Sequence, residues 1–226
     1  CFNSEKYGMN REVNWAPEVH KYNGRYYMFA TFTRECGLRG TFALVADSPL
    51  GPFVPHSDKP LTPEEWECLD GTLYIGRNGK PYIVFCHEHT QIIDGTMCYA
   101  ELKEDLRGLA GEAVTLFSAS SPYYVDKLPD GEHYITDGPF MYRTQSGKLI
   151  MIWSSQSKNG GYCELISCSD NGKIDGKWSC DEKTLFGTCD ANVEKTSFLL
   201  FFSFFIHRKR EKSLLKTREE YCGIFA

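Results

Sequence analysis

Apolar and polar positions alternate along most of this chain in a pattern that repeats three times. Each copy holds a short run, a turn containing glycine, and then an apolar stretch of strand length, in residues 15–31, 69–85 and 136–153. Asn23-Gly24 and Asn78-Gly79 mark the turns of the first two copies, and Ser146-Gly147 takes the same place in the third. Asn-Gly between alternating apolar residues predicts a two-residue β-hairpin of type I′, in which both turn residues have positive φ.

A further strand that opens with glycine follows each predicted hairpin, and a fourth short run completes each copy. The turn glycines 24, 79 and 147 are 55 and 68 residues apart, and the later glycines 40, 95 and 161 are 55 and 66 residues apart. Two separate markers therefore give one period. Four strands recurring at this spacing predict the blades of a β-propeller, so the fold class is all-β with about three four-stranded blades. The alternative is a sandwich of hairpins. We find no helical periodicity of useful length, which argues against a parallel α/β fold.

The pattern ends near Gly187, and this gives the expected domain boundaries. Residues 1–187 are predicted to form a partial propeller, whereas residues 188–226 form a tail with no hairpin turn and no alternation. In this tail an apolar block, residues 198–206, adjoins a basic one. We expect the tail to be out of register with the fold, through a frameshift or a wrongly joined gene, or to be disordered.

Composition narrows the possible partners. The formal net charge of −5 gives no reason to expect nucleic acid. The longest apolar run is far short of the roughly 20 residues of a membrane-spanning helix, so no membrane partner is expected. The ten cysteines are scattered, without a CxxC pair. We interpret them as reduced structural thiols rather than as zinc ligands or a disulfide framework, and no cofactor or metal is assigned.

Two acidic residues stand at matching places in the repeats. Asp70 precedes the turn glycine of its copy by nine residues, and Asp137 precedes its own by ten. In a propeller this position starts the innermost strand, so two such carboxylates converge at the mouth of the central channel. A pair of carboxyl groups is what glycoside hydrolysis requires, one as a proton donor and one as a base. The alternative is that both aspartates only cap turns.

The sequence motifs around these residues resemble those of glycoside hydrolase family 43. WAPE followed by NGRYY, LDGTLY followed by NGKPYIVF, and TDGPF followed by YR occur in order over residues 14–186. The resemblance implies a five-bladed propeller, here incomplete, that hydrolyses arabinofuranosides or xylosides of plant polysaccharides with inversion. The substrate would be a pentose-containing glycan, and the three motifs match the family's second, third and fourth blades.

The resemblance also implies roles for individual residues. Asp137 matches the general acid, which is usually the glutamate of an EGP motif, and Asp70 matches the aspartate that tunes and orients the acid. Trp15 and Glu18 match the segment that walls the sugar pocket. The family's base would lie upstream of Cys1, and His207 does not match its fifth-blade histidine, so we expect this chain to be impaired by truncation.

Two further questions stay open at this stage. His87, in His87-Glu88-His89, lacks the HExxH zinc spacing. It is either a sugar-contacting or channel-lining residue or a satisfied surface histidine. The chain as a whole is either a hydrolase or a non-catalytic glycan-binding propeller. Sialidase-type, fructan-cleaving and kelch-type propellers fit less well, because their motifs are absent.

Overall fold

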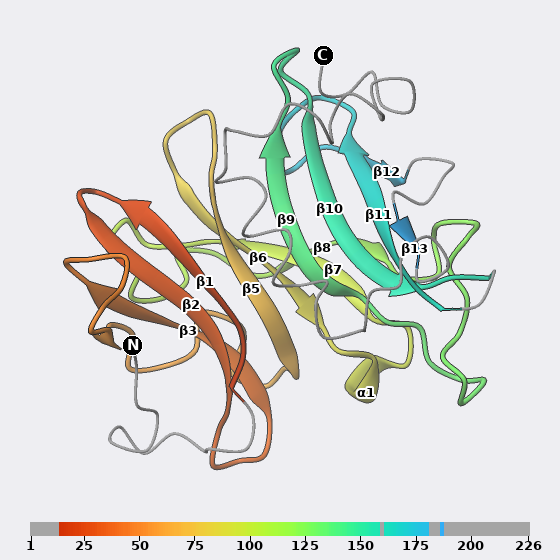
Figure 1. Ribbon diagram of the computed structural model, residues 1–226, viewed down its shortest axis with the longest axis horizontal. Coiled ribbons are helices and arrows are strands. Elements are labelled where there is room, and N and C mark those ends of the chain that lie inside the picture. The colour runs from red at the N-terminus through yellow and green to blue at the C-terminus, as the bar shows by residue number, and fades with distance from the viewer. Residues whose placement is uncertain (1–13, 159–160, 181–185, 188–226) are drawn as a thin grey trace.

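The computed structural model describes residues 14–158, 161–180 and 186–187, and these residues form three antiparallel sheets that lie side by side (Figure 1). The N-terminal blade contains β1 (Asn14–Tyr22), β2 (Arg25–Thr33), β3 (Arg39–Ala46) and β4 (Val54–Pro55). The middle blade contains β5 (Cys68–Ile75), β6 (Pro81–His87), β7 (Thr96–Glu101) and β8 (Val114–Ser118), with the one-turn helix α1 (His89–Ile92) after β6. The C-terminal blade contains β9 (Asp137–Arg143), β10 (Leu149–Gln156), β11 (Tyr162–Ser169), β12 (Trp178–Cys180) and β13 (Phe186–Gly187).

Within each blade, strands that follow one another in the sequence are also neighbours in the sheet. The order is β1-β2-β3-β4, β5-β6-β7-β8 and β9-β10-β11-β12, and the short β13 pairs with β11 as a fifth strand. This meander of four strands per unit is the arrangement that the repeat predicted, so the prediction of all-β propeller blades is confirmed. The predicted tail, residues 188–226, lies outside the described residues.

The hairpin turns differ in part from the prediction. Asn23 and Gly24 both have positive φ, 46° and 82°, as a type I′ turn requires. In the other two hairpins only the glycine does, with φ of 78° at Gly79 and 86° at Gly147. The amide of Gly79 donates to the carbonyl of Gly76 at 3.0 Å, and the amide of Gly147 donates to that of Thr144 at 2.9 Å. These are longer loops that end on a left-handed glycine, so the type I′ prediction is wrong for Asn78-Gly79.

The core lies between the blades, because alternate residues of the middle blade face opposite neighbours. Ile83 and Phe85 pack with Phe29 of the N-terminal blade, whereas Val84 and Cys86 pack with Trp153 of the C-terminal blade. All six residues are completely buried. The middle blade therefore contributes to two separate cores.

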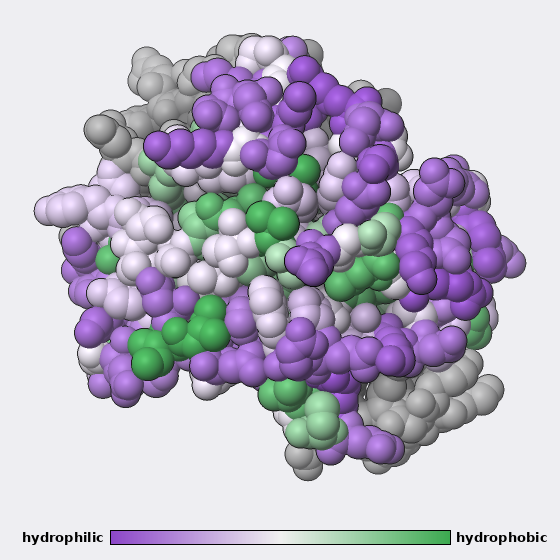
Figure 2. Space-filling model, turned by 180° about the vertical axis from the view of Figure 1, so that it is seen from behind, coloured by the Kyte–Doolittle hydropathy of each residue, from purple (hydrophilic) through white to green (hydrophobic). Residues whose placement is uncertain are grey.

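The outer faces of the two flanking blades are apolar as well. Phe42 and Leu44 belong to a buried cluster on the N-terminal blade, and Ile152 and Ile166 belong to one on the C-terminal blade. Strands that are apolar on both faces are typical of sheets that pack against others on both sides. The side of the molecule turned away in Figure 1 is mostly hydrophilic, with apolar residues gathered near its middle (Figure 2).

The described cysteines are free thiols, and four of them are buried in the strands, namely Cys68, Cys86, Cys98 and Cys163. Burial raises the pKa of the Cys86 and Cys98 thiols, which keeps them protonated. These four buried thiols pack in the same way as small apolar side chains. No helix in the described part of the chain is long and apolar enough to cross a bilayer.

Candidate active site

The innermost strands β1, β5 and β9 each carry an irregularity close to their first residues. The register shifts between Trp15 and Glu18 in β1, between Leu69 and Thr72 in β5, and opposite Ile152 and Ser154 in β9. One residue in each irregularity has positive φ: Ala16 at 47°, Asp70 at 55° and Gly138 at 51°. β-Bulges of this kind redirect side chains and are frequent beside active sites.

Two threonines of the N-terminal blade hold the bulge of β5 in place. The amide of Asp70 donates to Thr31 Oγ1, and the amide of Gly71 donates to Thr41 Oγ1, both at 3.0 Å. The two hydroxyl oxygens lie 3.3 Å apart on the paired strands β2 and β3. A β-carbon at Gly71 would come within 2.7 Å of Thr41, so this close approach requires glycine.

Asp70 and Asp137 are brought together across the boundary between the middle and C-terminal blades. Asp70 Oδ2 accepts a hydrogen bond of 2.9 Å from the amide of Gly138, the residue after Asp137. Asp70 is 8% exposed and Asp137 is partly exposed. The structure thus brings the two aspartates together at the starts of adjacent inner strands, β5 and β9, as the sequence predicted.

Burial and mutual proximity set the proton affinities of this pair. Burial and the charge of Asp137 raise the pKa of Asp70 to about 7, against the hydrogen bond from Gly138 and the charge of Arg39, which lower it. Burial also raises the pKa of Asp137. Because the two carboxyl groups interact, they titrate as a pair rather than independently. A carboxyl that keeps a proton near neutral pH is suited to act as a general acid.

Tyr162, at the start of β11, fixes the orientation of Asp137. Its hydroxyl donates to Asp137 Oδ2 at 2.5 Å. Burial and the charge of Asp137 raise the pKa of the Tyr162 phenol well above its usual value, so Tyr162 remains a hydrogen-bond donor. No sequence motif pointed to this tyrosine.

Glu88 is a third carboxyl group near the pair, and no repeat position or motif pointed to it. It follows β6 directly, is 3% exposed, and accepts a hydrogen bond of 3.0 Å from Arg39 Nη2 at Oε2. Its other oxygen, Oε1, is buried and has no hydrogen-bond partner among the described residues. Burial, together with the charges of Asp137 and Asp70, raises the pKa of Glu88 to about 8, although Arg39 opposes this. Glu88 therefore belongs to the same electrostatic group as the two aspartates.

The remaining sequence candidates lie around this pair in different environments. Trp15 is 46% exposed, and the Arg39 guanidinium lies 4.9 Å from its ring centre. Glu18 is partly exposed, accepts a hydrogen bond from Thr72 Oγ1 at 2.6 Å and lies 3.2 Å from His20 Nε2.

His87 lies in an enclosed environment at the end of β6. It is 8% exposed, stacks on Trp66 with ring centres 4.2 Å apart, and is bonded to Gln91 of α1 at 2.8 Å. The surface interpretation is wrong, because Trp66 and Gln91 cover the ring. The stacked and bonded ring leaves little surface for a sugar.

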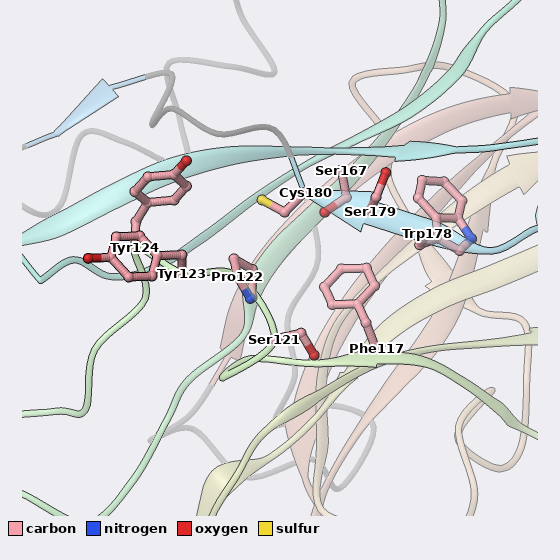
Figure 3. A pocket seen from close by; sticks show the side chains of 9 residues that line it. All are labelled: Phe117, Ser121, Pro122, Tyr123, Tyr124, Ser167, Trp178, Ser179 and Cys180. Atoms are coloured by element: carbon pink, nitrogen blue, oxygen red, sulfur yellow. The ribbon is translucent and has the colours of Figure 1, made fainter.

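The described residues contain no group of three or more His, Cys, Asp or Glu side chains arranged to hold a metal ion. Two concavities lie away from the aspartate pair. One of about 560 Å³ includes Tyr74, Tyr82 and Tyr99 near the hairpin ends. The other, of about 320 Å³, lies between the outer strands of the middle and C-terminal blades, with Tyr123 and Tyr124 at one end and Trp178 at the other (Figure 3). Neither concavity includes Asp70 or Asp137. The candidate site is therefore identified by the chemistry of its carboxyl groups and not by the size of a cavity.

Comparison with known proteins agrees with this geometry. The sequence profile of the family described as Glycosyl hydrolases family 43 matches residues 3–194. The chain belongs to glycosyl hydrolase family 43. The assignment agrees with the resemblance carried by the WAPE, LDGTLY and TDGPF segments.

Several solved structures are similar. An endo-arabinase from Bacteroides thetaiotaomicron VPI-5482 superposes with a TM-score of 0.73 and 43% identity, over 76% of this chain and 62% of that one. A thermostable family-43 glycoside hydrolase superposes with a TM-score of 0.67 and 25% identity, over 80% of this chain and 58% of that one. An α-L-arabinofuranosidase from Lactobacillus brevis shares the fold, with a TM-score of 0.60 and 19% identity over 80% of this chain and 57% of that one. The chain spans less than two thirds of these proteins. No protein of curated function matches it.

Proposed function

We propose that this family 43 protein hydrolyses arabinofuranosyl or xylosyl linkages in plant polysaccharides by an inverting acid/base mechanism. The observation that carries the proposal is the meeting of Asp70 and Asp137 through the Gly138 amide at the starts of β5 and β9. The endo-arabinase with 43% identity supports a pentose-containing glycan as the substrate class.

Asp137 is proposed as the general acid. The family resemblance matches it to the proton donor, and burial raises its pKa, which favours the protonated form that a general acid needs. The Tyr162 hydroxyl orients the carboxyl group at 2.5 Å. An aspartate is one methylene shorter than the usual glutamate, so the leaving oxygen has to approach the strand more closely.

Asp70 is proposed to position and tune that acid. It bonds the backbone next to Asp137, and when Asp70 is ionised its charge disfavours ionisation of Asp137. In the reaction the Asp137 proton passes to the leaving oxygen while a base removes a proton from water on the opposite face of the sugar. The family resemblance assigns this base to the blade that precedes β1.

Trp15 is proposed to contact the sugar, and Glu18 is proposed to wall the same pocket. The half-exposed indole of Trp15 offers an apolar face of the kind on which sugar rings stack. Glu18 offers a carboxylate already oriented by Thr72. For His87 we retain only a supporting role, because it is enclosed by Trp66 and Gln91.

The test is hydrolysis of arabino- and xylo-oligosaccharides, with the configuration of the first released sugar followed by NMR. Asp137→Asn should lower turnover of oligosaccharides at least 100-fold, since general acid catalysis contributes about 10²–10⁴-fold. An activated aryl glycoside, whose leaving group needs no proton, should lose much less. Asp47→Asn, at an exposed position, is the matched control.

Other outcomes would change the conclusion. Equal losses on both substrates would remove Asp137 from the acid role, and retention of configuration would overturn the inverting mechanism. Binding of oligosaccharides without any turnover would favour a non-catalytic glycan-binding propeller.

A further inference from the structure

Arg39, the first residue of β3, is held by groups from three other segments. Its backbone amide donates to Glu67 Oε2 at 2.9 Å, and its Nε donates to Glu67 Oε1. Its Nη2 donates to Glu88 Oε2 at 3.0 Å, and the guanidinium lies over the Trp15 ring. The side chain is only 13% exposed. An arginine held in this way has one position, and its charge is fixed in space.

The strand geometry directs this charge toward the aspartates. Alternate residues of a strand share a face, so Arg39 and Thr41 point the same way from β3. Thr41 bonds the amide of Gly71, next to Asp70, while Arg39 bonds Glu67, just before β5. Arg39 therefore lies alongside the first residues of β5, where Asp70 and Asp137 meet.

The charges around Arg39 are strongly unbalanced. It faces four carboxyl groups, those of Glu67, Glu88, Asp70 and Asp137. Within the described part of the chain, Arg39 makes hydrogen bonds to the two glutamates but to neither aspartate. The charge of Arg39 nevertheless lowers the pKa of Asp70, of Asp137 and of Glu88, against the effect of burial. In a poorly solvated site such through-space effects are larger than in water. The other titratable groups nearby are Cys86, His87, His89 and Tyr162.

We propose that Arg39 is a positioning residue that provides the counter-charge for Asp70 and Asp137, and that Glu67 and Glu88 hold it in place. The charge of the aspartate pair at a given pH then depends on a residue of the neighbouring blade. The use of this charge in catalysis rests on the proposed function, whereas the electrostatic effect itself does not.

The experiment is a titration of the side-chain carboxyl carbons by ¹³C NMR in the 226-residue chain, with Asp70→Asn and Asp137→Asn to assign the signals. Arg39→Gln removes the counter-charge and should raise the titration midpoints of Asp70 and Asp137 by about one pH unit. Glu67→Gln keeps an acceptor for Arg39 but removes a negative charge, so it should lower both midpoints. Arg39→Lys keeps the charge and should shift them less than Arg39→Gln.

The opposite signs separate the proposal from a purely structural role. Loosening of the site admits water and would lower both midpoints in every variant. Arg25→Gln, at an exposed arginine paired with Asp47, is the control and should change neither midpoint. Unchanged midpoints in folded Arg39→Gln, or shifts of the same sign in Arg39→Gln and Glu67→Gln, would overturn the proposal. If Arg39→Gln does not fold, the Glu67→Gln variant tests the proposal instead. Titration midpoints of Asp70 and Asp137 that do not fall in Glu67→Gln would refute the proposal.

This result is independent of hydrolysis. If the protein binds glycans without turning them over, the opposite shifts are still expected. If it hydrolyses them, the alkaline limb of kcat/KM, which reports loss of the acid's proton, should move to higher pH in Arg39→Gln.

Discussion

Asp70 combines two features that are unfavourable for folding. Its backbone has φ of 55°, in the left-handed region that costs most residues about 1–2 kcal/mol but that aspartate and asparagine tolerate better. Its carboxyl group is 8% exposed and lies against a second aspartate. A residue that only capped a turn would not need the buried carboxyl group. Strain and buried charge of this kind cluster at functional sites.

The first prediction concerns the stability of Asp70→Asn. Burial raises the pKa of Asp70 from 3.8 to about 7, so between these values the folded protein binds more protons than the unfolded chain. The free energy of unfolding should therefore fall as pH rises from about 4 to 7. Asparagine keeps the acceptor for Gly138 and removes the charge. Urea unfolding should show Asp70→Asn more stable than wild type by about 1–3 kcal/mol at pH 8.

At about pH 3, below both pKa values, Asp70 is protonated in the folded and the unfolded state, so the two proteins should have similar stability. A difference that is the same at both pH values would show that the charge of Asp70 is not its cause. Asp70→Ala is the control for the backbone, since it also loses the charge but should be less stable than Asp70→Asn in the left-handed conformation.

The residues of the site were predictable from the sequence only where the repeat marks them. Asp70 and Asp137 occupy matching places in two copies, and so do the turn glycines. Arg39, Glu88 and Tyr162 come from β3, from the end of β6 and from β11, and no equivalent position in another copy singles them out. Their importance arises from contacts between blades, which one sequence does not reveal.

At the scale of the element, the hairpin loops show how one residue fixes a turn. Gly79 has φ of 78° and no atom within 4 Å of a β-carbon placed on it, so only its backbone conformation restricts substitution. Gly79→Ala should therefore lower the free energy of unfolding by about 1–2 kcal/mol, and Gly79→Asn by less, because asparagine enters this region more readily. Urea unfolding of the two variants measures the difference. An equal loss in both would indicate that contacts, not φ, restrict this position.

The bulge of β5 is restricted in the opposite way. Gly71 needs space, since a β-carbon there would lie 2.7 Å from Thr41 Cγ2 and 2.8 Å from Ile83 Cδ1. Gly71→Ala should cost about 1–3 kcal/mol through overpacking and should displace Asp70. Gly108→Ala, whose nearest neighbour is Lys103 Nζ at 3.9 Å, is the matched control. Thermal unfolding of both variants tests this, and a tolerated Gly71→Ala would mean that the bulge adjusts freely.

At the scale of the whole molecule, the meander of strands was predictable because each blade is local in sequence. The register of the bulges was not, since it depends on Thr31 and Thr41 of one blade bonding the backbone of the next. The same contacts explain why the aspartates meet. The site exists only where blades are packed together, so its integrity depends on the cores between them.

The last prediction separates these cores with two neighbouring residues of β6. Ile83 faces the N-terminal blade and Val84 faces the C-terminal blade, and both are fully buried. Ile83→Val should cost about 0.5–1.5 kcal/mol, and Val84→Ala a similar or somewhat larger amount. Amide hydrogen exchange should then show faster local opening of β2 and β3 in Ile83→Val, and of β10 and β11 in Val84→Ala. Amides of β6 and β7 should respond in both variants, because the middle blade shares both cores. Equal loss of protection in all three sheets for both variants would instead mean that the blades open only as one cooperative unit.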